Sequence, residues 1–183
     1  MRKVSLVFIG CCLWSMTVNA TTIRSLTIAQ RVAKADRVAI ALVESIEYVK
    51  SPTQHRIYTL TKLRVLEPLK GQITKDLNLT VRQIGGTIGD WTQHVPGDAT
   101  FVAGKEVLVF LRHDPKDDLH FLVGMGQGKI DVDVAADTIK RAHGIAPPSN
   151  HPTLKLRTSS DQSSTGHLSF LVEQIRQMLT PPP

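Results

Sequence analysis

Hydrophobic and polar residues alternate along much of the chain with the two-residue period of a β-strand. Residues 76–84 show the cleanest alternation, with Leu77, Leu79 and Val81 separated by polar residues. Successive side chains of a strand point to opposite faces of a sheet, so these three residues are expected to face inward. The same period predicts further strands over residues 56–66, 119–123 and 129–134, the last with Ile130, Val132 and Val134 facing inward.

Two other segments are apolar at consecutive positions. Residues 38–43, at the start of a predicted strand over 37–49, contain no polar residue, and residues 106–112 contain five apolar residues in a row. Strands of this composition are typically buried on both faces. Both are therefore expected in the middle of the structure.

Glycine and proline separate the predicted strands. Pro68 is expected to end the strand before it, because proline cannot donate a hydrogen bond to a central ladder. Gly85 and Gly86 end the next strand, and a double glycine at this place indicates a bulge or an approach of the backbone too close for a Cβ atom. Structural turns are also expected at Gly97, Gly104 and Gly128.

Helical patterns lie on either side of the strands. Thr27 and Gln30 have the spacing of a capping box, which predicts a short helix ending near Ala35. Towards the other end, apolar residues recur at helical spacing, namely Leu168, Leu171, Ile175 and Leu179. This second helix either docks on the strands or offers its apolar stripe to a partner.

These elements predict a mostly β protein of the all-β class. Five or six antiparallel strands with short connections, between a short N-terminal helix and a C-terminal helix, favour a small OB-like barrel, and a β-sandwich is the alternative. The expected organisation is a β-barrel domain over residues 21–143, a Pro/Ser/Thr-rich linker over 144–166, and the helix and tail over 167–183.

Residues 1–20 have the composition of a signal peptide. An apolar run over residues 4–14 follows two positive residues and is too short for a membrane span, which takes roughly 20 residues. Small residues before position 21 favour cleavage after Ala20, whereas cleavage before Cys11 or Cys12 would give a lipoprotein. The prediction is export to the periplasm or the cell exterior, with no transmembrane segment after cleavage.

Cleavage after Ala20 would remove both cysteines and lower the formal net charge from +6 to about +4. The mature chain would then have no disulfide and no thiol nucleophile, which is more typical of a bacterial envelope protein than of an animal extracellular domain. Its modest positive excess fits ordinary solubilising charge, and it also fits an anionic envelope polymer as a partner.

Two histidines and three aspartates lie within the eight residues from 113 to 120. These are metal-ligand residue types, so His113, Asp117 and His120 are candidate ligands in a metal-binding protein or a metal-dependent hydrolase. Their spacing matches neither a helical zinc motif nor a calcium loop. A solvated hairpin tip is the alternative interpretation.

The remaining motifs give no catalytic residue and no cofactor. Residues 124–129 are glycine-rich, but the sequence after them predicts a strand and not the helix that a phosphate-binding loop requires. No serine occupies a strand-turn-helix elbow that would expose a nucleophile. Most aromatic residues lie at core-like positions, and this, together with export, argues against nucleic acid as the partner.

Residues 87–95 are expected to form a short strand or an ordered loop that carries Trp91. With Arg82 and His94 nearby in the sequence, Trp91 marks the candidate contact site, because tryptophan and arginine are frequent at binding hot spots. The alternative is that Trp91 closes one end of the barrel. The leading hypothesis is a non-catalytic binding module that contacts a protein or an anionic envelope polymer, with its oligomeric state left open.

The order of features resembles a group of small exported bacterial proteins that have no activity to transfer. The resemblance covers residues 35–134 and rests on ADRV at 35–38, RVLEPLKG at 64–71, RQIGG at 82–86, VPG at 95–97, the F-x-x-GKEVLVFL pattern at 101–111 and the VG-x-x-QGK pattern at 123–129.

More remotely, the pattern is similar to netrin-type, OB-like barrels such as tissue inhibitors of metalloproteinases. This similarity implies a five-stranded barrel and protein binding, and it adds a third hypothesis, a regulator or inhibitor of an exported protease. Those inhibitors place an N-terminal cysteine on the protease zinc. Here the predicted mature chain begins at Thr21 and has no cysteine, so that mechanism cannot operate in the same way.

Overall fold

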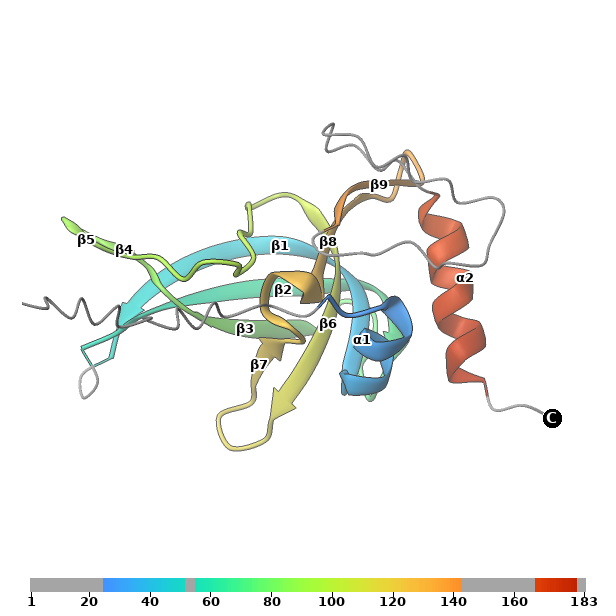
Figure 1. The fold of residues 1–183 in the computed structure, drawn as a ribbon, viewed down its shortest axis with the longest axis horizontal. Helices are drawn as coiled ribbons and strands as arrows, with labels where there is room; N and C mark the ends of the chain where they lie inside the picture. Colours follow the sequence, from blue (N-terminus) through green and yellow to red (C-terminus); the bar gives the residue numbers. More distant parts are fainter. Residues whose placement is uncertain (1–24, 52–54, 143–166, 181–183) are drawn as a thin grey trace, which may run out of the picture.

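The computed structural model describes residues 25–51, 55–142 and 167–180, which are mostly β with two α-helices (Figure 1). The predicted leader and linker lie outside the described residues. The elements in chain order are α1 (Ile28–Lys34), β1 (Arg37–Lys50), β2 (Ile57–Lys70), β3 (Asn78–Ile84), β4 (Gly86–Ile88), β5 (Trp91–Gln93), β6 (Glu106–Asp114), β7 (Leu119–Leu122), the 3-10 helix η1 (Met125–Gly128), β8 (Lys129–Asp133), β9 (Thr138–Ala142) and α2 (Leu168–Leu179).

Five strands form a ring of hydrogen-bonded neighbours. β1 pairs with β2, β2 with β3, β3 with β7, β7 with β6, and β6 returns to β1. β8 and β9 continue the sheet beyond β6, while β4 and β5 form a separate hairpin. The predicted meander of the first three strands is confirmed. The expectation of antiparallel pairing throughout is wrong at one place, because β3 and β7 run parallel.

β1 and β6 are shared by two apolar cores. Side chains of one parity face the inside of the ring, where the buried residues are Ala39, Ala41, Val43, Leu63, Val65, Ile73, Leu79, Val81, Phe101, Val107, Val109 and Leu111. Side chains of the other parity, such as Ile40 and Phe110, lie in a second core outside the ring. The prediction that both strands are buried on both faces is confirmed.

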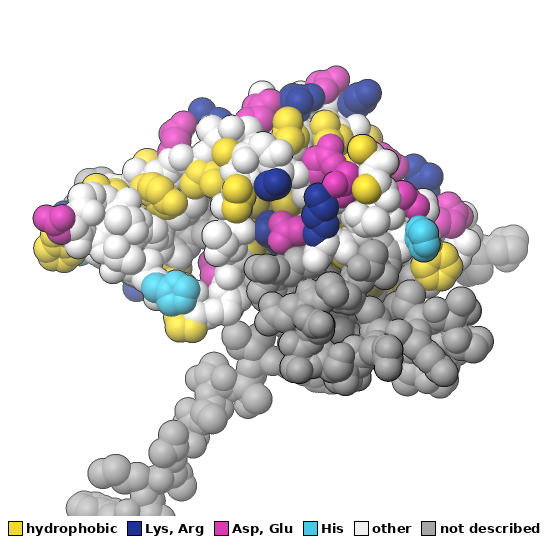
Figure 2. Space-filling view, turned by 90° about the horizontal axis from the view of Figure 1, so that it is seen from above, with side chains coloured by type: hydrophobic (Ala, Val, Ile, Leu, Met, Phe, Trp, Pro, Cys, Tyr) yellow, Lys and Arg dark blue, Asp and Glu magenta, His cyan; other side chains and the backbone are white. Residues whose placement is uncertain are grey.

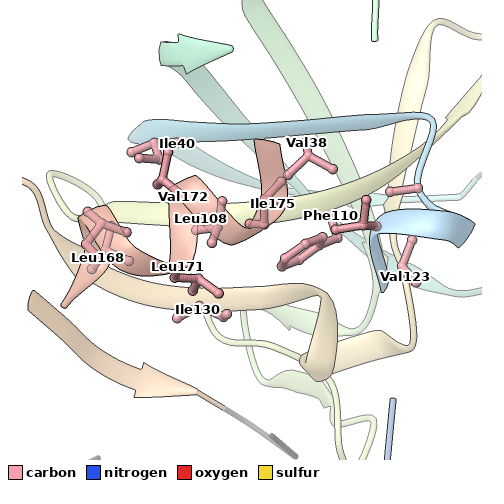
Figure 3. Close-up of a cluster of buried hydrophobic side chains, with 13 residues drawn as sticks. Val38, Ile40, Leu108, Phe110, Val123, Ile130, Leu168, Leu171, Val172 and Ile175 are labelled. Atoms are coloured by element: carbon pink, nitrogen blue, oxygen red, sulfur yellow. The ribbon is translucent and has the colours of Figure 1, made fainter. Parts of the chain in front are cut away.

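The two α-helices cover the second core. Leu168, Leu171, Val172 and Ile175 of α2 point towards the side chains of β1, β6 and β8 (Figure 3). A surface ion pair between Arg176 Nη2 and Glu67 Oε1, at 2.6 Å, joins the helix to β2. Of the two predicted alternatives for this helix, docking is therefore the one that the structure shows.

α1 begins at the predicted capping box. Gln30 N donates to Thr27 Oγ1 at 3.2 Å, and Thr27 N donates to Gln30 Oε1 at 3.0 Å. At the other end of the helix, Lys70 Nζ donates to the carbonyl oxygens of Val32 and Ala35, both at 2.7 Å. These bonds satisfy carbonyl groups that a helix end leaves without intrahelical partners.

Pro68 does not end its strand, contrary to the expectation. β2 continues to Lys70, and Pro68 pairs with Ala39 next to a register shift. β3 pairs only with residues 58–64 of β2, so Pro68 lies where β2 is an edge strand on that side. A missing N–H is tolerated at an edge or a bulge.

Two residues expected inside are at the surface, and one strand was not predicted. Leu77 is 38% exposed because it precedes β3, and Val134 is 42% exposed because it lies in the turn after β8. That turn leads into β9, which pairs with β8. Among the described residues, neither helix has the length and apolar character needed to cross a membrane.

Shortening Ile175 should destabilise the protein by about 2–5 kcal/mol, because Ile175→Ala leaves a cavity in a fully buried site between α2 and the sheet. Phe170→Ala on the same helix is the matched control, since Phe170 is half-exposed, and it should cost less than about 1 kcal/mol. Urea denaturation followed by circular dichroism measures both changes. Equal effects of the two substitutions would contradict the docking of α2.

Candidate functional site

The β4–β5 hairpin forms the end of the molecule opposite α2 (Figure 1). Gly85 and Gly86, with φ of 111° and 132°, let the chain turn from β3 into this hairpin. A Cβ atom on Gly86 would lie 2.4 Å from Tyr48 Cδ1, and one on Gly85 would lie 2.7 Å from the carbonyl oxygen of Gln93. The double glycine therefore provides the close backbone approach that the sequence suggested, here over the end of β1.

Two hydrogen bonds fix the base of the hairpin to β2. Thr59 Oγ1 donates to the carbonyl oxygen of Gly85 at 2.8 Å, and Ile57 N donates to Gln93 Oε1 at 3.0 Å. The hairpin is therefore anchored at its base, while its far end projects from the sheet.

Trp91 lies on this hairpin and is 75% exposed. Lys50 Nζ lies 5.6 Å from the centre of the indole ring, and Tyr48 on β1 is 49% exposed. In the space-filling view, the left part of the visible face, at the hairpin end, shows mostly uncharged side chains, whereas most acidic and basic side chains gather farther to the right (Figure 2). Trp91 is thus a surface residue and not a lid over the ring interior.

A hollow of about 150 Å³ lies at the base of the hairpin. Ile46, Tyr48, Gln83, His94 and Phe101 are among its lining residues. Gln83 Nε2 already donates to the carbonyl oxygen of Ala99 at 2.8 Å, which links β3 to the chain after the hairpin. The half-exposed Tyr48 lines this hollow, so the hollow adjoins the exposed aromatic surface.

Arg82 faces away from this hollow. Leu79 and Val81 point into the ring, so alternation along β3 directs Arg82 to the outer face of the sheet. There its Cζ lies 5.5 Å from the ring centre of Tyr58 and 4.8 Å from that of Phe121, and its Nη1 lies 3.5 Å from Asp117 Oδ2. The three predicted contact residues therefore do not form one site, because Trp91 and His94 lie on the hairpin side.

Sequence reasoning did not find the aromatic partners of Arg82. Phe121 is far away in the chain, and the parallel pairing of β3 with β7 brings it next to Arg82. Tyr58 and Phe121 each occupy the outward parity of a strand whose other parity faces the interior. An aromatic residue at an otherwise polar strand position is the signal that could have identified them.

The predicted metal ligands are only partly brought together. The rings of His113 and His120 stack with centres 5.0 Å apart, whereas Asp117 pairs with Arg82. Both ring nitrogens of His120 have partners, since Arg37 Nη1 is 2.7 Å from Nε2 and the Thr80 carbonyl oxygen is 3.2 Å from Nδ1. Within residues 25–51, 55–142 and 167–180, no group of three His, Cys, Asp or Glu side chains is arranged to hold a metal ion.

The histidine pair instead joins the start of β1 to the β6–β7 hairpin. Asp36 accepts a hydrogen bond from His113 N at 3.0 Å, and His113 Nε2 lies 2.8 Å from Asp118 Oδ1. That hydrogen bond lowers the pKa of Asp118. Burial lowers the pKa of His120, and a neutral ring with its proton on Nδ1 satisfies both the Thr80 carbonyl and the Arg37 guanidinium.

The other glycines expected in turns lie in the connections between strands. Gly97 and Gly104 have positive φ, of 81° and 75°, and lie in the connection between β5 and β6. Gly128 ends η1, and a Cβ atom there would lie 2.7 Å from the backbone of Val123. β8 follows η1 directly, so the glycine-rich segment is not followed by the helix of a phosphate-binding loop.

No protein-family model matches the chain, and no curated protein matches it significantly.

The His120 ring predicts a pH dependence of stability. Because its pKa in the folded state lies below the ordinary value of about 6.5, the unfolded chain binds a proton that the folded chain does not. The neutral His120 ring therefore contributes to the free energy of unfolding in full above about pH 6.5. This contribution is lost as the pH falls from about 6.5 towards the lowered pKa. Chemical denaturation at a series of pH values should show this loss in the wild type and not in His120→Gln.

His94→Gln is the control for this experiment, because His94 is exposed on the hairpin side. It should keep the wild-type pH dependence. If His120→Gln also kept it, His120 would not be the group that titrates.

Proposed function

We propose that this protein is an exported, non-catalytic binding module that contacts a protein or an anionic envelope polymer through its hairpin end. The observation that carries the proposal is Trp91, which is three-quarters exposed on a projecting hairpin anchored at its base. A large aromatic residue of this kind supplies much contact area at a small cost in side-chain entropy, and tryptophan is enriched at binding hot spots.

Two cations at this end support an anionic partner. Lys50 lies over Trp91, and Arg56 is exposed in the turn between β1 and β2, where its carbonyl oxygen accepts from Ser51 N. In the described part of the chain, neither cation lies within ion-pair distance of a carboxylate. Their charge is therefore available to a ligand.

The fold that we propose for this module is an OB-like barrel. The ring order β1-β2-β3-β7-β6 with a return to β1 supports it, and so does the parallel pair of β3 and β7 within an otherwise antiparallel ring. Export rests on the leader-like residues 1–20. A protease regulator is the form of this function that the remote similarity to netrin-type barrels would imply.

Trp91 provides its own test, because the sequence has two tryptophans and the other, Trp14, belongs to the predicted leader. In a chain that begins at Thr21 and is labelled with 5-fluorotryptophan, the fluorine signal reports on Trp91 alone, also in the presence of unlabelled proteins. Protein and polysaccharide fractions of an envelope extract are added separately, and the fraction that holds the partner should shift or broaden this fluorine resonance. Trp91→Ala should weaken retention of that fraction by roughly thirtyfold, as expected for a hot spot of about 2 kcal/mol.

Phe170→Ala is the matched control, since Phe170 is an exposed aromatic residue on α2, at the other end of the molecule. Its binding should equal that of the wild type. An unchanged fluorine resonance with both fractions, or equal retention by Trp91→Ala and the wild type, would refute the proposed function.

A further inference from the structure

The outer face of β2, β3 and β7 carries a second surface, separate from the Trp91 hairpin. Leu60 on β2 pairs with Arg82 on β3, and the register of β3 with β7 brings Phe121 next to Arg82 on the other side. A groove of about 250 Å³ runs beside this row, and Val49, Lys50, Tyr58, Leu60, Arg82 and Leu119 line it.

Arg82 is held in place mainly by aromatic rings and by one long ion pair. Its guanidinium lies between the rings of Tyr58 and Phe121, which attract the cation without accepting a conventional hydrogen bond. Nε is buried and has no hydrogen-bond acceptor among the residues that the structure describes, and Nη1 reaches Asp117 only at 3.5 Å. Asp117 itself is 57% exposed, so this ion pair is a weak one.

The groove combines apolar walls with a cation. Val49, Leu60 and Leu119 supply aliphatic walls, and Arg82 supplies positive charge. Lys50 also borders the groove, but its ammonium lies over Trp91. A sugar would bring hydroxyl groups that apolar walls cannot satisfy, and burying unsatisfied hydroxyl groups is unfavourable. A carboxylate next to an apolar side chain matches both the charge and the walls. The volume is slightly below that of typical small-molecule pockets, about 300–1,000 Å³, and so suits one large side chain.

We propose that this groove binds a peptide segment in which a carboxylate lies beside an apolar side chain. The carboxylate pairs with the Arg82 guanidinium, and the apolar side chain lies against Tyr58 and Leu60. Asp117 competes with the ligand for Arg82. The inference rests on the proposed binding function and names a partner chemistry for it, but it concerns a different face from Trp91, so each can fail without the other.

Three small peptides test the proposal by nuclear magnetic resonance with the full chain. Acetyl-Leu-Phe has a terminal carboxylate, acetyl-Glu-Phe-amide has a side-chain carboxylate, and acetyl-Gln-Phe-amide has neither. At least one charged peptide should shift the Arg82 Nε–Hε signal and the methyl signals of Leu60 and Leu119, and the neutral peptide should not. Which charged peptide binds more tightly distinguishes a chain terminus from an acidic side chain as the source of the carboxylate.

Two substitutions should change the affinity for the charged peptides in opposite directions. Asp117→Asn removes the competing carboxylate and should tighten binding about two- to fivefold, a gain that misfolding cannot produce. Arg82→Gln should weaken binding at least about tenfold. Arg64→Gln is the matched control, because Arg64 is a half-buried β2 arginine whose partners are Glu44 and Asp76, and it should leave the affinity unchanged.

Any of three results would overturn the proposal. The neutral peptide could bind as well as the charged ones, Asp117→Asn could weaken binding, or all three peptides could leave the signals unshifted. Polygalacturonate serves as an anionic glycan probe. If it shifted the Arg82 signal while the peptides did not, the groove would be an anion site for glycans and the peptide assignment would be wrong.

Discussion

Burial of β1 on both faces is the constraint on which the rest of the structure depends. Ala39, Ala41 and Val43 lie in the ring interior, whereas Val38 and Ile40 lie under the two helices. Because the same strand contributes to both cores, the ring and the helical layer cannot separate without exposing one of them to water. β6, which pairs with β1 along residues 37–42, extends this shared layer by a second strand.

The same constraint explains where the candidate functional surfaces lie. β6 stops pairing with β1 at Leu42, but β1 continues to Lys50 as the strand partner of β2. Its last residues, from Tyr48 to Lys50, pass beyond both cores and lie next to the hairpin that holds Trp91 and to the groove beside Arg82. The end of the molecule with α2 thus consists of packed apolar side chains, whereas the hairpin end presents aromatic and cationic side chains to solvent. The Arg37–His120 contact belongs to the packed part, since it joins β1 to β7.

Features that depend on short-range patterns could be predicted from the sequence. The consecutive apolar residues of β1 and β6, the Thr27–Gln30 capping box and the helical spacing in α2 each express a local requirement of the element they form. The close approach at Gly86 belongs to this group too, because only glycine fits beside Tyr48.

Features that depend on the choice of a distant partner could not be predicted. Alternation in β3 does not say that β7 pairs with it, or that the two run parallel, so the cluster of Tyr58, Arg82 and Phe121 was missed. For the same reason Arg82 was grouped with Trp91, its near neighbour in sequence, although strand alternation directs it to the other face. Pro68 was expected to end β2 because proline cannot donate a hydrogen bond to a central ladder. β2 is an edge strand at Pro68 because β3 stops pairing at Arg64, and the local sequence does not show this.

Native-state hydrogen exchange tests most directly whether the doubly buried strand holds the molecule together while the hairpin end stays independent of it. Amides of β1 between residues 38 and 42 should exchange only through global unfolding, with an opening free energy equal to the total stability. Amides of β4 and β5 should exchange through local opening at a clearly lower free energy. Equal opening free energies for the hairpin and for β1, or faster exchange in β1 than in the hairpin, would contradict this account.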